Sequence, residues 1–251
     1  MRYILPLLCL SFGLTLVGQS FVEGAKNKDQ AILFAVSYGP EVPLADLADR
    51  FGANWSVGAE LGFTPKKSKW MGSFQGKFFF GNDAKEDVLA GLRVSGGFII
   101  GNERLPADIK LRMRGLYFGA RVGRLFSLGK NPRAGIQLGF GAGVFSHRIR
   151  IQFDPSQTVN QLVGDYRSGY DRLVAGPAVT NFIGWYQLSN DGRANFFAGI
   201  ESTAAFTTNQ RDFDFATAGT FEESRFDVSI GFRAGLIIPF YLGEGEDIFY
   251  R

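Results

Sequence analysis

The sequence has little of what enzymes and metal proteins commonly use. Its 251 residues include one cysteine, Cys9, and one histidine, His147. Because Cys9 lies in an apolar N-terminal segment, the chain beyond that segment offers no disulfide, no thiol nucleophile and no cysteine-based metal site. A single histidine also excludes the strong zinc-binding patterns. We therefore expect no metal site and no cofactor.

Charge of one sign and long apolar runs are also scarce. The 27 basic and 24 acidic residues give a formal net charge of +3, too small and too dispersed to indicate a nucleic-acid partner. Beyond the N-terminus no apolar run is long enough for a membrane helix, although 45% of the residues are hydrophobic. The 33 glycines and 26 phenylalanines fit a transmembrane β-barrel, in which large lipid-facing residues alternate with small lumen-facing ones.

Residues 1–20 have the parts of a secretory signal peptide. A single arginine precedes an apolar core, and small residues suited to cleavage follow. We expect cleavage near Ser20 and export of the chain, with residues 21–30 as a flexible lead-in. The alternative is a buried or anchoring helix.

The clearest strand runs from Arg225 to Leu242, where alternate residues differ in kind. The first set is apolar throughout, and the second opens with polar or small residues. Side chains of a strand point to opposite faces with period two, and this strand exceeds the roughly nine to eleven residues that span a bilayer. It predicts one face toward lipid and one toward a barrel lumen. The alternative is a long strand of a soluble barrel or sandwich. The apolar set is Phe226, Val228, Ile230, Phe232, Ala234, Leu236, Ile238, Phe240 and Leu242.

Seven further segments alternate in the same way. They are residues 31–39, 53–64, 69–81, 113–127, 134–153, 173–188 and 194–208. Together with the last strand they predict an all-β fold: a closed antiparallel transmembrane β-barrel of about eight strands over residues 31–242. Residues 243–251 would form a periplasmic C-terminal tail.

The connections between these segments alternate in length. The short ones are residues 65–68, 128–133 and 189–193, and the long ones are residues 40–52, 82–112, 154–172 and 209–224. Short periplasmic turns and long extracellular loops are typical of outer-membrane barrels. Aromatic residues beside the short turns suggest an interfacial girdle: Phe63, Trp70, Phe126, Trp185, Tyr186, Phe196, Phe240 and Tyr241. The predicted location is the cell outer membrane.

Three details of the predicted barrel depend on local signals. Pro40 and Pro43 are expected to end the first strand, and the following LADLADRF could form one helical turn. Residues 82–112 contain two strand-like pieces, but counting both would give an odd total where an even one is needed. We therefore expect one long loop that rises as a hairpin. After Val144 the apolar residues change phase, which indicates a bulge or emergence above the bilayer.

The chain resembles a small OmpA/OmpX-type outer-membrane β-barrel. Several of its stretches also resemble an uncharacterised family of outer-membrane barrels from Bacteroidota: YGPEVPLADLADRFG, FFFGNDAKEDVL, GFIIGN, SHRIRIQ, GDYRSGYDRL and NQRDFDFATAG. The resemblance implies fold and location and carries no activity, so it assigns no residue a role. The terminal Arg251 departs from the aromatic residue that usually ends such barrels.

Five charged residues are predicted to face the lumen. They are Glu60, Lys77, Arg121, Glu201 and Arg233. An eight-stranded barrel has an interior that side chains fill, and buried charges are tolerated there only when they are paired. We expect Glu201 to pair with Arg233 on the neighbouring strand, and Glu60 and Lys77 could do likewise. The favoured interpretation is a stabilising network, and the alternative is a gated ion path.

His147 and its neighbours are the remaining candidates for chemistry. Ser146 adjoins His147, but neighbouring residues of a strand point to opposite faces, which disfavours a catalytic pair. We predict no catalytic residue. Arg148 and Arg150 instead suggest a basic collar that contacts lipid phosphates at the outer rim.

The resulting prediction is a non-enzymatic outer-membrane barrel with a filled lumen, structural or surface-binding through its extracellular loops. Its expected partners are outer-membrane lipid and lipopolysaccharide, with another envelope protein as a second candidate. The main alternative is an accessory barrel of an outer-membrane export or assembly machine. A lipid A-modifying enzyme and a narrow channel are further alternatives.

Overall fold

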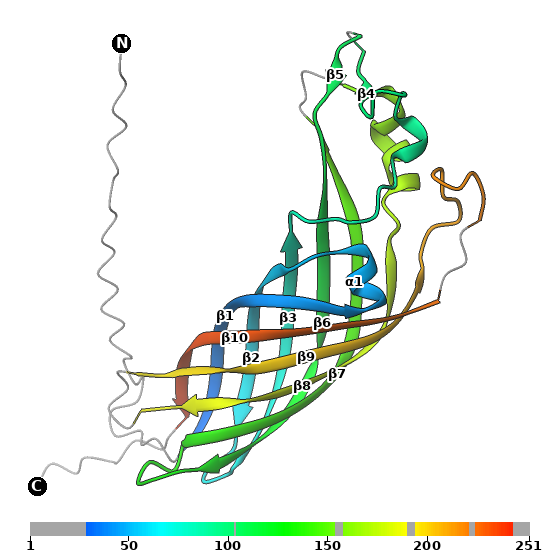
Figure 1. The fold of residues 1–251 in the computed structure, drawn as a ribbon. Helices are drawn as coiled ribbons and strands as arrows, with labels where there is room; N and C mark the ends of the chain where they lie inside the picture. Colours follow the sequence, from blue (N-terminus) through cyan, green and yellow to red (C-terminus); the bar gives the residue numbers. More distant parts are fainter. Residues whose placement is uncertain (1–28, 103, 154–157, 190–193, 221–223, 243–251) are drawn as a thin grey trace, which may run out of the picture.

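The computed structural model describes residues 29–102, 104–153, 158–189, 194–220 and 224–242. Over these ranges no helix has the length and apolar character needed to cross a bilayer. Eight long strands form a closed barrel in the order β1-β10-β9-β8-β7-β6-β3-β2, and each neighbouring pair is antiparallel (Figure 1). The predicted fold class is therefore confirmed.

The strand bounds lie close to the predicted ones. The barrel strands are β1 (Gln30–Ala45), β2 (Asn54–Thr64), β3 (Trp70–Gly81), β6 (Ile109–Ser127), β7 (Ala134–Phe153), β8 (Val174–Gln187), β9 (Phe196–Asn209) and β10 (Ser224–Leu242). The signal peptide, the lead-in to residue 28, the turn at 190–193 and the tail at 243–251 lie outside the described residues.

The elements outside the barrel all lie in the long connections. They are α1 (Asp46–Arg50), η1 (Ala90–Leu92), β4 (Ile99–Ile100), β5 (Pro106–Ala107), η2 (Asn160–Leu162) and η3 (Gly164–Tyr170). Figure 1 shows these elements at one end of the barrel, where β6 and β7 extend beyond their neighbours. We call this the long-loop end and the opposite end the short-turn end.

The first strand is longer than predicted. β1 continues through Pro40 and Pro43 to Ala45, because it is hydrogen-bonded to β2 on one side and β10 on the other. β2 pairs with β1 as far as Glu41 and β10 pairs with it as far as Ala45, so the loss of two N–H donors does not end the strand. The helical turn predicted in LADLADRF is present as α1.

The loop at 82–112 contains less strand and ends earlier than predicted. Within residues 88–100 only Ile99 and Ile100 form a strand, so the hairpin is reduced to the two-residue strands β4 and β5. β6 begins at Ile109, because its first residues pair with the end of β7. The prediction that this connection does not span the barrel wall is correct.

The change of phase in β7 is not a bulge. The pairing of β6 with β7 is continuous, and Phe145, Ile149 and Ile151 still face inward, where they join a buried apolar cluster. The side chains of Arg148 and Arg150 face outward. The apolar pattern changes phase because the upper part of β7 has an apolar interior and a polar exterior, which fits emergence above the bilayer.

Two apolar clusters fill the lumen from either end. The cluster at the long-loop end combines residues of the strands, α1 and the loops, among them Leu47, Phe79, Leu89 and Tyr117. The cluster at the short-turn end includes Phe182, Phe197 and Ile237. One predicted girdle residue belongs to this second cluster: Tyr186 is buried, because it follows the outward Trp185 and therefore points to the opposite face.

Candidate functional site

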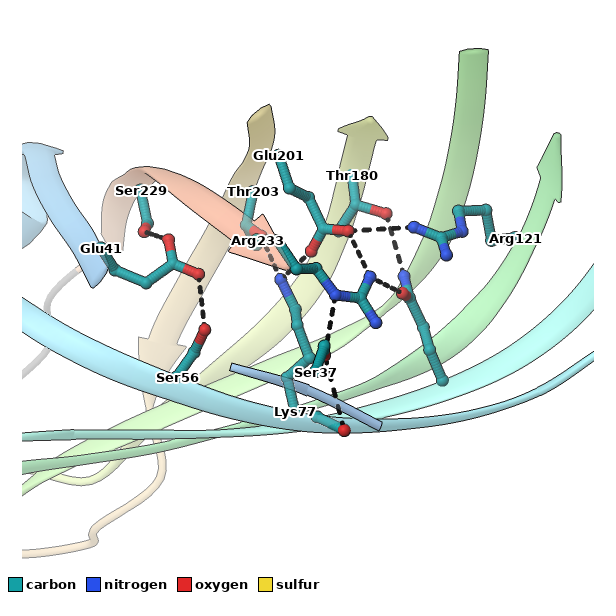
Figure 2. Close-up of polar contacts among 12 residues, drawn as sticks. Ser37, Glu41, Ser56, Lys77, Arg121, Thr180, Glu201, Thr203, Ser229 and Arg233 are labelled. Carbon is teal, nitrogen blue, oxygen red and sulfur yellow. Dashed lines mark hydrogen bonds and ion pairs between the residues drawn. The ribbon is translucent and has the colours of Figure 1, made fainter. Parts of the chain in front are cut away.

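The five predicted lumen charges form one network between the two apolar clusters. Arg233 Nη1 lies 2.6 Å from Glu201 Oε2, the contact that the sequence predicts, and Arg121 Nη1 lies 3.0 Å from the same oxygen. Lys77 donates to the other oxygen of Glu201 and, at 3.1 Å, to Thr203 Oγ1. Figure 2 shows the three cations converging on Glu201.

The second carboxylate, Glu60, does not pair with Lys77, so that predicted pair is wrong. Glu60 accepts from Arg121, and its Oε2 lies 3.3 Å from Nη2 of Arg233. The register of β2 and β3 places Glu60 opposite Gln75 and Lys77 opposite Gly58. Lys77 instead extends across the lumen to β9, where Glu201 already holds the two arginines.

Glycines on the neighbouring strands leave room for the long charged side chains. Lys77 is paired with Gly58, Arg121 with Gly141, Glu201 with Gly231 and Arg233 with Gly199 in the strand registers. A Cβ at Gly58 would lie 2.8 Å from Ser37 Oγ, and one at Gly141 would lie 2.6 Å from Thr180 Oγ1. A side chain at Gly58 would therefore displace Ser37, which accepts a hydrogen bond from Arg233 Nε, and one at Gly141 would displace Thr180.

Aromatic rings cover the network from both sides. The ammonium of Lys77 lies 5.0 Å from the ring centre of Phe79 and 5.3 Å from that of Tyr117. The guanidinium of Arg121 lies 5.3 Å from Phe182, and that of Arg233 lies 5.2 Å from Phe197. A cavity beside Glu60 and Arg121 measures about 20 Å³, room for about one water molecule. The lumen is filled at this level.

The lumen also holds two sets of polar contacts that the sequence does not predict, one around Glu41 and one around Asp227. Glu41 Oε2 accepts from Ser229 Oγ at 2.6 Å, and its Oε1 accepts from Ser56 Oγ at 3.0 Å. His147 Nε2 lies 2.8 Å from Asp227 Oδ2, and Asp227 also contacts Arg225. The signal that could have found Glu41 is the period-two pattern of β1, which continues past Pro40.

The neighbourhood of His147 does not resemble a hydrolytic site. His147 is buried between the rings of Phe51 and Phe145. Ser146 faces the other side of β7 and donates weakly to the carbonyl of Leu116 at 3.5 Å. In the described ranges no cluster of His, Cys, Asp or Glu side chains has the arrangement of a metal site.

The loops are joined by ion pairs above the barrel. Arg50 on α1 is buried, and its Nε lies 2.7 Å from Glu86 Oε2 in the loop between β3 and β6. Glu86 also pairs with Arg172, whose Nε lies 3.1 Å from Asp214. All four long loops are thereby connected. In the same region, the hydrogen bond from Arg93 holds the pKa of the Asp87 carboxyl below its usual value.

The outer surface of the strands carries a belt of exposed apolar side chains. Phe74 and Phe118 are 62% and 63% exposed, and Phe140, Ile200 and Phe232 are also exposed. On β6 the belt runs from Leu116 to Phe126, interrupted by Arg124, whose guanidinium lies 5.2 Å from the ring centre of Phe126. This span corresponds to about 25 Å for strands that rise about 3.3 Å per residue and tilt by about 40°. In a closed barrel the backbone N–H and C=O groups of each strand are hydrogen-bonded to neighbouring strands, so the barrel can be surrounded by lipid. The chain therefore has the architecture of a transmembrane β-barrel.

No protein-family model matches the chain, and no curated protein is significantly similar to it. The solved structures that are similar to it include the following three. The attachment invasion locus protein Ail of Yersinia pestis is 8% identical, with a TM-score of 0.43 over 83% of this chain and 99% of that chain. Neisserial surface protein A is 13% identical, with a TM-score of 0.38 over 82% and 95%. The outer membrane protein OprG of Pseudomonas aeruginosa is 10% identical, with a TM-score of 0.31 over 86% and 98%.

Proposed function

We propose that the protein is a non-enzymatic barrel of the outer membrane whose lumen is closed and whose long loops carry recognition at the cell surface. The observation that carries this proposal is the lumen network of Glu60, Lys77, Arg121, Glu201 and Arg233, packed between two apolar clusters. A path for ions would need these pairs to separate and both clusters to open. Buried ion pairs that lose a partner are strongly destabilised.

Planar-bilayer recording of the purified, folded protein tests the closed lumen. We expect no steady single-channel conductance in potassium chloride. A control variant, Thr203→Ser, keeps a hydroxyl beside Lys77 and should be equally silent. A steady open pore in the wild-type protein would contradict the proposal and favour the narrow-channel alternative.

The surface-binding part of the proposal is supported by an aromatic group on two long loops. The rings of Tyr166 and Tyr170 contact Phe215, which also contacts Phe213. Tyr166 is 64% exposed. A hollow of about 390 Å³ is bordered by Asn160 and by the rings of Tyr166, Tyr170 and Phe215. Exposed aromatic rings on loops held by a rigid scaffold are typical of binding surfaces.

A pull-down in mild detergent compares the surface-binding role with that of an accessory subunit. Tagged protein with Tyr166→Ala and Phe213→Ala should lose a loop-bound partner, whereas Leu128→Ala in a short turn should retain it. Purification of a defined envelope complex that survives the loop substitutions would favour the accessory role.

The proposal also includes the signal peptide and the relationship to the Bacteroidota family. Mass measurement of the exported chain tests the cleavage near Ser20.

A further inference from the structure

Several arginines gather on one outer face of the barrel, beyond the two that the sequence analysis singled out. Arg112 and Arg114 on β6 stand directly opposite Arg150 and Arg148 on β7. Arg167 on η3 lies on the other side of a groove of about 610 Å³, which Arg114, Arg148 and Arg150 also line. This volume falls within the range of roughly 300–1,000 Å³ that is usual for small-molecule sites.

The positive charge of this groove is poorly compensated. Like charges directly opposite each other on paired strands are destabilising. In the part of the chain that the structure describes, Arg112, Arg114, Arg150 and Arg167 form no ion pair. Arg148 lies 3.5 Å from Asp171, but Asp171 already accepts two hydrogen bonds from Arg211, at 2.9 and 2.6 Å. The groove therefore favours an anion.

The groove forms where β8 separates from β7. Their pairing ends at His147 and Val174, and farther along β7 the amide of Ile149 donates to the carbonyl of Asp171 at 2.8 Å. The loop that carries η3 thus replaces a strand as the neighbour of β7. It supplies Arg167 and Ser168 as one wall of the groove, while the strands supply the other.

The groove adjoins the upper edge of the apolar belt. Phe78 and Leu116 line its lower side, and both side chains are exposed on the lipid-facing surface. A ligand that fits both parts has an anionic head and an apolar tail. Guanidinium groups bind phosphate oxygens through two parallel hydrogen bonds, so several arginines suit a phosphate better than a carboxylate.

We propose that this arginine groove binds the phosphate group of an outer-leaflet lipid, with the acyl chains against Phe78 and Leu116. The proposal rests on the membrane setting of the proposed function and adds a defined site to it. Arg114 joins the predicted Arg148 and Arg150 in the lining, and Arg167 closes the site from the loop. Arg112 adds positive charge opposite Arg150. Free inorganic phosphate shares the same chemistry and is the competing source.

Native mass spectrometry of the full-length protein in detergent tests the groove. The probes are lipid A, the same lipid A after removal of its phosphates, and inorganic phosphate as a competitor. We expect Arg148→Gln with Arg150→Gln to weaken binding of phosphorylated lipid A about tenfold or more. The matched control, Arg124→Gln with Lys130→Gln, removes the same charge at the short-turn end and should bind like the wild-type protein.

A single-residue variant and a competition experiment distinguish the remaining outcomes. Arg167→Gln changes a loop residue outside the strands and should weaken binding about threefold even if the double variant fails to fold. Displacement by inorganic phosphate alone would identify free phosphate as the ligand, whereas retention of lipid A would identify the lipid headgroup. Equal binding of phosphorylated and dephosphorylated lipid A, or unchanged binding in the groove variants, would overturn the proposal. Conductance concerns the lumen, so either proposal can fail without the other.

Discussion

Glu201 is the lumen residue on which the other charges depend most. It contacts Lys77, Arg121 and Arg233, whereas Glu60 contacts only the two arginines. Burying a charge costs several kcal/mol unless a partner and hydrogen bonds offset that cost. The network is therefore stable only as a complete set, and the loss of one carboxylate leaves cations without compensation.

We predict that Glu201→Gln lowers the free energy of unfolding by about 3–5 kcal/mol. The measurement is urea unfolding of the protein in lipid vesicles, followed by tryptophan fluorescence. Asp49→Asn, which neutralises an exposed carboxylate on α1, is the control and should change stability by less than about 0.5 kcal/mol. Adding Lys77→Met to Glu201→Gln should recover part of the loss, because it removes one unpaired cation. Equal midpoints for Glu201→Gln and the wild-type protein would contradict the network as described.

At the scale of the strands, buried and exposed side chains alternate along β7, so adjacent residues should differ in how much they contribute to stability. Ile149 is buried in the upper apolar cluster, and Arg150 is exposed. We predict that Ile149→Ala costs about 2–4 kcal/mol, as large-to-small changes in packed cores do, whereas Arg150→Ala leaves stability within about 0.5 kcal/mol. Unfolding in vesicles measures both. A larger loss for Arg150→Ala would reverse the assignment of faces.

The strands could be predicted from the sequence because period two is strong wherever one face meets lipid and the other a narrow lumen. Glu60 and Lys77 were correctly placed inside for this reason. Their partners could not be predicted, because Lys77 reaches across the lumen from β3 to Glu201 on β9, strands that are not neighbours in the barrel. The sequence does not place Glu41 in the lumen, because Pro40 is expected to end the strand before it. A proline ends a strand only where the hydrogen bond from the missing N–H is needed to hold the strand in the sheet.

The long loops behave as one unit because Glu86 joins two arginines from different connections. It contacts Arg50 on α1 and Arg172 before β8. We predict that Glu86→Gln leaves the barrel folded but increases hydrogen exchange in the loop segments at least severalfold, since both arginines lose their shared carboxylate. The control is Asp108→Asn, which changes an exposed carboxylate next to the start of β6. Unchanged exchange in Glu86→Gln would show that the apolar cluster alone orders the loops.

At the scale of the whole molecule, the height of the apolar belt determines which bilayers the protein fits. The belt of about 25 Å is shorter than the hydrocarbon core of a typical bilayer, about 30 Å thick. Above it, the outer faces of β6 and β7 carry the arginine groove, which is costly to place in lipid. The barrel should therefore prefer a thin membrane, because mismatch costs fractions of a kcal/mol per Å.

We predict that a larger fraction of the protein folds into dilauroyl than into dioleoyl phosphatidylcholine vesicles, and that its unfolding midpoint is higher in the thinner bilayer. Leu116→Arg shortens the belt at its upper edge, so it should lower the midpoint more in the dioleoyl than in the dilauroyl lipid. Phe98→Arg changes an exposed aromatic residue in a loop above the belt and should show no dependence on chain length. Gel migration of unheated samples measures the folded fraction. If Leu116→Arg and Phe98→Arg respond alike to bilayer thickness, the upper edge of the belt does not lie at Leu116.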